Sequence, residues 1–245
     1  DVSGPGALAR LQPLADSQMD VAEGGAGYTQ FLNAKAGIEA DVTVTRLGAQ
    51  HFRITSGAAT RWRDLVWLRR HAGDQVALHD VTETECVIGV MGAGSRILLA
   101  GLSGDDWQDF PFSTARRVSV AGVACLATRV SFVGELGWEL SVPIADAARL
   151  FDALTGAGAR PLGHYALDGC RIEKGYRHWG HDLGPEISPL EAGLGFAVDW
   201  DKDFLGKPAL QAQRGALTRR MVLMEVEGRP LILHDEPVRE AGGVV

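Results

Sequence analysis

The stretch from residue 37 to residue 47 constrains the fold more strongly than any other part of the chain. Its apolar residues, all on one side of an extended backbone, are Ile38, Ala40, Val42 and Val44. Its polar residues, on the opposite side, are Glu39, Asp41, Thr43 and Thr45. Because successive side chains of a strand point to opposite faces, this alternation predicts a β-strand with one buried face. From spacing alone, the simplest interpretation of Asp41 is a solvated carboxylate on the polar face.

Further strands and helices follow without a regular strand–helix–strand order, which favours an α+β fold over a doubly wound sheet. The 31 glycines among 245 residues indicate many tight turns. Periodicity predicts helices near residues 3–14, 58–71, 145–157 and 163–176. It predicts strands near residues 21–30, 51–57, 76–81, 86–91, 116–142 and 221–228. In the second helix Trp62 is expected to face inward, and in the fourth Tyr165 is a candidate for packing.

Charge and cysteine content exclude several classes of protein. The 24 Lys and Arg residues against 31 Asp and Glu residues give a net charge of −7 without a basic cluster, so no nucleic-acid partner is expected. No apolar run approaches the roughly 20 residues that cross a bilayer, so no membrane association is expected either. The three cysteines lie far apart without a CxxC pair, which predicts no disulfide framework and a reducing, cytoplasmic location.

One short segment contains candidate metal ligands. His178, His181 and Asp182 lie together in HWGHD, but Gly180 separates the histidines and the region has the composition of a loop. We therefore expect ordinary loop histidines and no metal. No glycine-rich phosphate-binding loop follows a strand, so a nucleotide site is not expected.

The segment 128–143 is a better candidate for a binding site. As a single strand it would place Glu135, Gly137 and Glu139 on one face, with one carboxylate on each side of a glycine, which has no side chain. A carboxylate only accepts hydrogen bonds, so this face would suit a flat heterocycle with adjacent N–H donors, such as a pterin. A solvated polar face is the alternative that the pattern leaves open.

Four segments carry a resemblance to a known family. They are GYTQFLNAKAGIEADVTVTRL at 27–47, VIGVMGAGSR at 87–96, SFVGELGWEL at 131–140, and the block that begins GHYALDGCRIEKGYRHWGHD and extends over 163–210. In this order they resemble the folate-binding aminomethyltransferases, which include the glycine cleavage T-protein. The likeness is greatest to the C-terminal folate domains of dimethylglycine and sarcosine dehydrogenases.

The resemblance implies a cloverleaf of subdomains around a central tetrahydrofolate site, followed by a β-barrel. Residues 1–206 would form the folate-binding region, with a middle subdomain at roughly 45–118. Residues 207–245 would be the start of the barrel, which we expect to be incomplete. Ala36-Gly37 stands where the family usually has Gly-Gly. Leu167 replaces an Arg of the glycine-cleavage branch, which favours the dehydrogenase-linked branch.

The resemblance also assigns roles to single residues. Asp41 matches the family's catalytic acidic residue, and Glu139 matches the carboxylate that receives the N–H groups of the pterin. Phe52 stands where T-proteins place an aromatic that packs on the cofactor ring, and Tyr28 lies in the strand before Asp41. Glu135 either contacts the cofactor or shapes the turn beside it.

The expected function follows from the family. A methylated amine is oxidised elsewhere to an iminium, and its one-carbon unit passes to tetrahydrofolate to give 5,10-methylenetetrahydrofolate. The expected partners are that small amine and a flavin dehydrogenase module or subunit. Two alternatives stay open: a tetrahydrofolate-dependent S- or O-demethylase, and a folate-binding module without catalysis.

Overall fold

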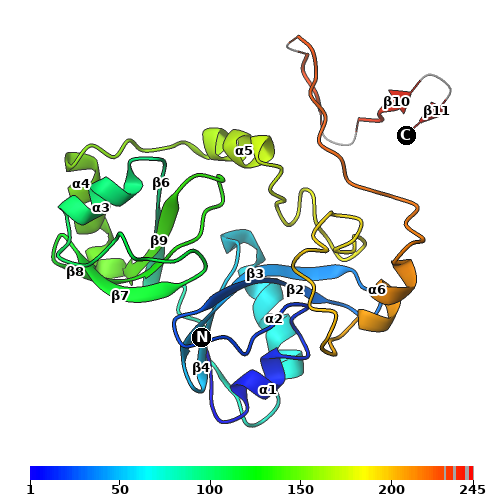
Figure 1. The fold of residues 1–245 in the computed structure, drawn as a ribbon, viewed down its shortest axis with the longest axis horizontal. Coiled ribbons are helices and arrows are strands. Elements are labelled where there is room, and N and C mark those ends of the chain that lie inside the picture. The colour runs from blue at the N-terminus through cyan, green and yellow to red at the C-terminus, as the bar shows by residue number, and fades with distance from the viewer. Residues whose placement is uncertain (229, 234–235, 241–242, 245) are drawn as a thin grey trace.

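A computed structural model describes residues 1–228, 230–233, 236–240 and 243–244 of the chain. Two antiparallel sheets form two lobes that lie side by side, and the chain passes from the first to the second and back again (Figure 1). The expected mixture of helices with antiparallel strands is confirmed, because every strand pair within these two sheets is antiparallel.

The first sheet has the strand order β2-β3-β4-β1-β5. Its strands are β1 (Val2–Ser3), β2 (Ala26–Leu32), β3 (Ile38–Gly48), β4 (His51–Thr55) and β5 (Ala77–Leu78). β3 is the strand that the alternation predicts, and its four predicted apolar residues are buried. β2 and β3 form a hairpin in which Gln30 lies opposite Asp41 and Tyr28 lies opposite Thr43. Residues opposite each other in a ladder share a face, so these four side chains lie on one side of the sheet.

The two faces of this sheet pack against different parts of the chain. On one face, α1 (Ala7–Leu11) and α2 (Arg61–Ala72) cover a core around Val42. On the other face, the irregular segment 177–206 packs against β2 and β3, as the yellow part of the ribbon shows in Figure 1. Asp41 belongs to this second face, so its surroundings depend on a segment that lies far away in the sequence.

The second lobe is built on a sheet of order β6-β9-β8-β7. Its strands are β6 (Glu85–Met91), β7 (Ala115–Val120), β8 (Val123–Thr128) and β9 (Gly137–Pro143). Two helices, α3 (Ser95–Gly101) and α4 (Ala147–Gly156), pack on it. The core centres on Trp138, whose ring meets Trp107 edge-on at 5.3 Å and Phe110 at 5.8 Å between ring centroids. Aromatic pairs prefer such edge contacts, and all three rings are buried.

The chain returns to the first lobe through α5 (His164–Glu173) and the segment 177–206, and α6 (Lys207–Gln213) follows. Backbone hydrogen bonds join this segment to the first lobe, from Asp199 N to Asp16 O and from Leu205 N to Pro13 O, each 2.8 Å long. Short 3₁₀ turns at Ala58–Thr60 and Ile144–Asp146 precede α2 and α4.

The predicted strand at residues 221–228 is wrong, because no strand forms anywhere in 214–228. Its apolar residues Val222, Leu223, Met224 and Val226 are exposed. An alternating segment becomes a strand only where a neighbour supplies hydrogen bonds and a surface to cover. Within the described residues, β10 (Arg239–Glu240) and β11 (Gly243–Val244) pair only with each other. The expected start of a barrel is therefore not formed by the described part of the chain.

The predicted strand 128–143 is also corrected. Residues 129–136 form a loop and only Gly137–Pro143 is a strand, β9. Gly134 has a φ of +70°, which no continuous strand accommodates. Glu135 therefore lies on the loop and does not share a strand face with Glu139.

Two helix faces differ from the prediction as well. Trp62 is exposed on α2 while Asp64 is buried, and Tyr165 is exposed on α5. Helical spacing identifies residues that share a face, but tertiary packing decides which face is covered. No helix in the described residues is long and apolar enough to cross a membrane.

Candidate active site

Asp41 lies at the centre of a polar group on the second face of the first sheet. Its carboxylate oxygen Oδ1 accepts a hydrogen bond of 2.7 Å from Nε2 of Gln30, the residue directly across the hairpin. The Tyr28 hydroxyl is a second donor that stabilises the ionised Asp41 carboxylate. Phe196, from the segment 177–206, stacks on the Tyr28 ring with 6.5 Å between centroids and is itself largely exposed. Polar side chains of β2 and β3 thus surround Asp41, and the exposed ring of Phe196 lies at the solvent side of the group.

Burial raises the pKa of Asp41 to about 6, although the hydrogen bonds from Tyr28 and Gln30 oppose the shift. The negative charge of Asp64 on α2 raises it further. Burial is also the main reason that the pKa of the Tyr28 hydroxyl is raised, with the Asp41 carboxylate adding to it. A carboxylate with a pKa near neutrality holds and releases protons readily, as general acid–base chemistry requires.

Glu139 lies on β9 of the second lobe, between Gly89 of β6 and Thr128 of β8 in the ladder. Burial raises the pKa of its carboxyl group. Among the described residues, none donates a hydrogen bond or forms an ion pair with this carboxylate. Glu139 is partly exposed and lies on the opposite face of β9 from the buried Trp138, so its carboxylate is an accessible hydrogen-bond acceptor.

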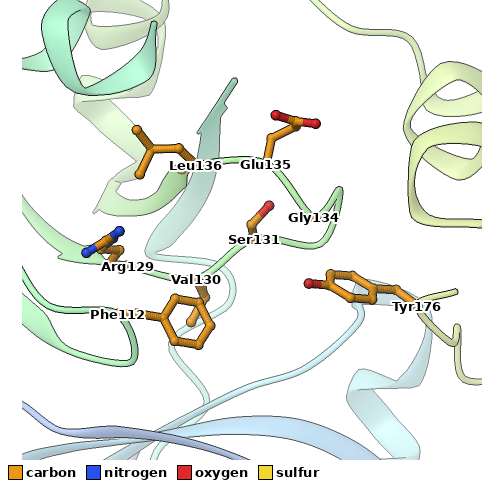
Figure 2. A pocket seen from close by; sticks show the side chains of 9 residues that line it. Phe112, Arg129, Val130, Ser131, Gly134, Glu135, Leu136 and Tyr176 are labelled. Carbon is orange, nitrogen blue, oxygen red and sulfur yellow. The ribbon is translucent and has the colours of Figure 1, made fainter. Parts of the chain in front are cut away.

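Glu135 lines a pocket beside β9 that has a volume of about 330 Å³. Figure 2 shows Glu135, Ser131 and Arg129 along the loop on one side, with the Tyr176 hydroxyl pointing toward that loop from the other side. The Glu135 carboxylate lies 3.7 Å from Lys174 Nζ. The pocket reaches Gly137, two residues before Glu139, but neither Glu139 nor Asp41 lines it.

Phe52 is not brought to this site. It is completely buried on β4, in the core that α1 and α2 cover, and it pairs with Arg46 in the ladder. Arg46 follows Val42 and Val44 at alternate positions of β3, so Phe52 lies on the opposite side of the sheet from Asp41. The prediction that Phe52 packs on a cofactor ring is therefore corrected: its ring packs in the first core.

Sequence reasoning missed Gln30 and Phe196. The signal for Gln30 was available, because pairing the strands around Tyr28 and Asp41 as a tight hairpin places Gln30 opposite Asp41. Phe196 had no such signal, since a loop residue reaches the site only through the tertiary fold. The two loop histidines, His178 and His181, contact each other with 4.7 Å between ring centroids and an angle of 55° between ring planes. In the part of the chain that the structure describes, no three His, Cys, Asp or Glu residues group as metal ligands would.

Ala36 and Gly37 explain the tight turn between β2 and β3. Ala36 has a φ of +68° and is completely buried, a conformation that glycine adopts more readily than alanine. Asn33 closes the turn, because its Oδ1 accepts hydrogen bonds from the backbone N–H groups of Lys35 and Gly37. The turn holds β2 and β3 in the register that places Gln30 against Asp41.

Residues 1–202 match the GCVT N-terminal domain. The chain belongs to this aminomethyltransferase family. This GCVT domain is 43% identical over 250 residues to 4-methylaminobutanoate oxidase (formaldehyde-forming) of Paenarthrobacter nicotinovorans. The alignment covers 97% of this chain and 30% of that protein. It is 37% identical over 243 residues to human mitochondrial sarcosine dehydrogenase, in an alignment that covers 89% of this chain and 26% of that enzyme.

Two further relatives are shorter. The GCVT domain is 35% identical over 251 residues to the aminomethyltransferase of Synechococcus elongatus, in an alignment that covers 99% of this chain and 67% of that enzyme. Its fold is similar to the crystal structure of the glycine cleavage system aminomethyltransferase T from Bartonella henselae, with a TM-score of 0.78 and 26% identity over 88% of this chain and 60% of that one. The chain thus spans less than a third of the oxidase and dehydrogenase relatives, whose names all denote enzymes.

Proposed function

We propose that this GCVT domain transfers a one-carbon unit from a methylated amine, oxidised to an iminium, to tetrahydrofolate, giving 5,10-methylenetetrahydrofolate. The observation that carries the proposal is Asp41: a largely buried carboxylate with two neutral donors and a pKa of about 6. Its place in an aminomethyltransferase family supports the choice of reaction. The partly buried Glu139 carboxylate, which has no protein donor among the described residues, supports folate as the recipient of the carbon, because it offers the hydrogen-bond acceptor that a pterin N–H edge requires.

Tetrahydrofolate, when bound, supplies the nucleophilic nitrogen that accepts the carbon. Glu139 would hold the pterin by accepting hydrogen bonds from its N–H groups, and would thereby fix its orientation. Asp41 would act as the general base that takes the proton lost by that nitrogen, or would hold its N–H in place. Gln30 donates to Oδ1 of Asp41 and Tyr28 is the second donor to this carboxylate, so the two residues would fix its orientation while it holds the proton. The domain contributes mostly orientation and exclusion of water.

The substrate and the partner are part of the proposal. The relatives named sarcosine and dimethylglycine dehydrogenase favour a methylated amine as the carbon source. They also favour a flavin dehydrogenase, as a module or a subunit, as the source of the iminium. The cloverleaf arrangement, with a folate-binding region over 1–206 and a middle subdomain at 45–118, belongs to the same proposal.

Replacement of Asp41 by asparagine tests the proposal. Asp41→Asn keeps the size of the side chain and removes its charge and basicity, so folate affinity should stay within a few-fold while the transfer rate falls about 10²–10⁴-fold. The assay follows methylenetetrahydrofolate formation with an amine and a flavin dehydrogenase, above the rate at which free formaldehyde reacts with tetrahydrofolate unaided. Thr43→Ala, two residues along the same face, is the control and should change little. A wild-type rate in Asp41→Asn would refute the mechanism, and folate binding without any enzyme-dependent rate in the wild type would indicate a non-catalytic module.

A further inference from the structure

A second buried carboxylate lies behind the hairpin that carries Asp41. Asp16 follows α1 and is completely buried. Its Oδ1 accepts two hydrogen bonds from β2, one of 2.9 Å from the Thr29 hydroxyl and one of 2.8 Å from the backbone N–H of Gln30. Its Oδ2 is buried without a hydrogen-bond partner among the described residues. Asp16 therefore fixes the main chain of β2 at Gln30.

Gln30 connects the two carboxylates. Its backbone N–H donates to Asp16, and its side-chain Nε2 donates to Asp41. The Gln30 side chain is completely buried, and its Oε1 has no partner among the described residues. The opposite orientation of the carboxamide would place its oxygen against the Asp41 carboxylate, and two acceptors repel each other. The amide is thus held in one orientation, with its donor toward Asp41.

Lys202 supports the Asp16 end of this arrangement. Its ammonium group donates to the backbone carbonyls of Gln12, at 2.6 Å, and Ala15, next to Asp16. Its positive charge favours the ionised form of Asp16. Lys202 belongs to the segment 177–206, so the docking of that segment reaches the hairpin behind Asp41. Hydrogen bonds connect Asp16 to Gln30 and Gln30 to Asp41, and Lys202 acts on Asp16 through its charge.

We propose that Asp16 and Gln30 are positioning residues for Asp41: Asp16 anchors the Gln30 main chain, and the Gln30 amide, through its hydrogen bond to Oδ1, orients the Asp41 carboxylate. The inference rests on the proposed function of Asp41 and adds two residues to it. Neither residue touches a substrate, since Asp16 and the Gln30 side chain are both completely buried.

The charges around Asp41 give opposite expectations for the two residues. Gln30 and Tyr28 on β2 donate to Asp41, and Asp64 on α2 adds a like charge. The loss of the Gln30 donor removes a contact that favours the ionised form, so the pKa of Asp41 should rise. Asp16 and Asp41 repel each other as like charges, so removal of the Asp16 charge should lower the pKa of Asp41. Asp16→Asn removes a like charge and a Gln30 variant removes a donor, so the two changes separate the effect of charge on Asp41 from the effect of its hydrogen bond.

The test measures Asp41 itself. Carbon-13 NMR with aspartate labelled at its side-chain carboxyl follows the titration of each aspartate in the chain, and the signal missing in Asp41→Asn identifies Asp41. Gln30→Met keeps the length of the side chain without its donor, and should raise the Asp41 midpoint by about one pH unit. Gln30→Glu should raise it further, because it adds a negative charge. Asp16→Asn should lower the midpoint.

Thr45→Val is the matched control, because Thr45 is a buried polar residue of the same strand and outside the site. It should leave the Asp41 midpoint unchanged. Equal midpoints in wild type, Gln30→Met and Gln30→Glu would overturn the proposal, as would a shift of the same size in Thr45→Val. If Gln30→Met does not fold, Gln30→Glu carries the measurement. The readout needs no folate, so a full transfer rate in Asp41→Asn would refute the proposed function and leave the Gln30 result standing.

Discussion

The carbonyl oxygen of Pro185 lies against the α-carbon of Gly37, so close that a Cβ at Gly37 would be 1.7 Å from it. The same carbonyl accepts a hydrogen bond of 3.0 Å from Asn33 Nδ2. The next residue, Ile38, donates its backbone N–H to the carbonyls of Gly184 and Ile187. The turn that precedes the Asp41 strand is therefore joined to the segment 177–206 by direct backbone contact, and only glycine permits the approach.

Gly37→Ala should destabilise the protein strongly, because the clash is with backbone atoms that cannot rotate away. We expect a loss of about 2–4 kcal/mol in the free energy of unfolding, measured by chemical denaturation. Gly169→Ala in α5 is the control, since a Cβ there meets nothing within 4 Å. It should stabilise the protein by up to about 1 kcal/mol, because alanine is the better helix former. Equal stability of the two variants would show that the Pro185 contact is not as close as described.

Glu139→Gln should weaken tetrahydrofolate binding by about one to two powers of ten, because a charged acceptor becomes an amide that also presents an unwanted donor. Titration calorimetry measures the dissociation constant. Since burial raises the pKa of Glu139 above its usual value, wild-type affinity should fall as the pH drops toward that raised pKa, and the variant should lack this dependence. Glu135→Gln, on the loop, provides the comparison. An unchanged affinity in Glu139→Gln would place the pterin elsewhere.

Arg171→Lys should destabilise the helix α5 region by about 2–4 kcal/mol. Arg171 is buried, and its guanidinium donates to Asp168 Oδ1 at 2.6 Å, to the Asp182 carboxylate, and to the Tyr176 carbonyl at 3.1 Å. A lysine has one ammonium group and cannot reach all three acceptors. Arg149→Lys, at the partly exposed pair with Asp146, should cost less than about 1 kcal/mol. Thermal unfolding of both variants checks the difference, and equal losses would contradict the buried network.

Asp16→Asn should change how stability depends on pH. Burial raises the pKa of Asp16 to about 6, from the ordinary aspartate value of 3.8. The folded state then binds the proton more tightly than the unfolded state, so this group lowers stability as the pH rises from about 4 to about 6. The difference in unfolding free energy between Asp16→Asn and wild type should move in favour of the variant by roughly 3 kcal/mol across that range. Denaturation at several pH values measures it, and a constant difference would show that the pKa of Asp16 is not raised.

Local patterns predicted the elements that depend on nearby residues. The alternation at 37–47 identified β3 and its buried face, and the α+β class followed from the order of elements. Pattern failed at 128–143, where the positive φ of Gly134 interrupts a sequence that alternates like one strand. It failed again at 221–228, where no neighbouring strand is present in the described residues to pair with an alternating segment.

The candidate site divides in the same way. Asp41, Tyr28 and Glu139 could be chosen from residue type, strand position and family resemblance. Phe52 could not be placed correctly, because its side of the sheet depends on the register of β3 with β4. Register is decided by pairing over many residues, and a shift of one residue moves a side chain to the other face.

The sequence by itself determined which residues could do acid–base chemistry and which strand would carry Asp41, because both follow from side-chain type and from a period of two along the chain. Only the tertiary structure decided which neighbours surround the Asp41 carboxylate and how deeply it is buried. Gln30 meets Asp41 across a hairpin, Asp16 anchors Gln30 from behind, and the segment 177–206 covers the face from far away in the sequence. Burial and hydrogen bonding set the proton affinity of a carboxylate, and both arise from neighbours that the folded chain assembles.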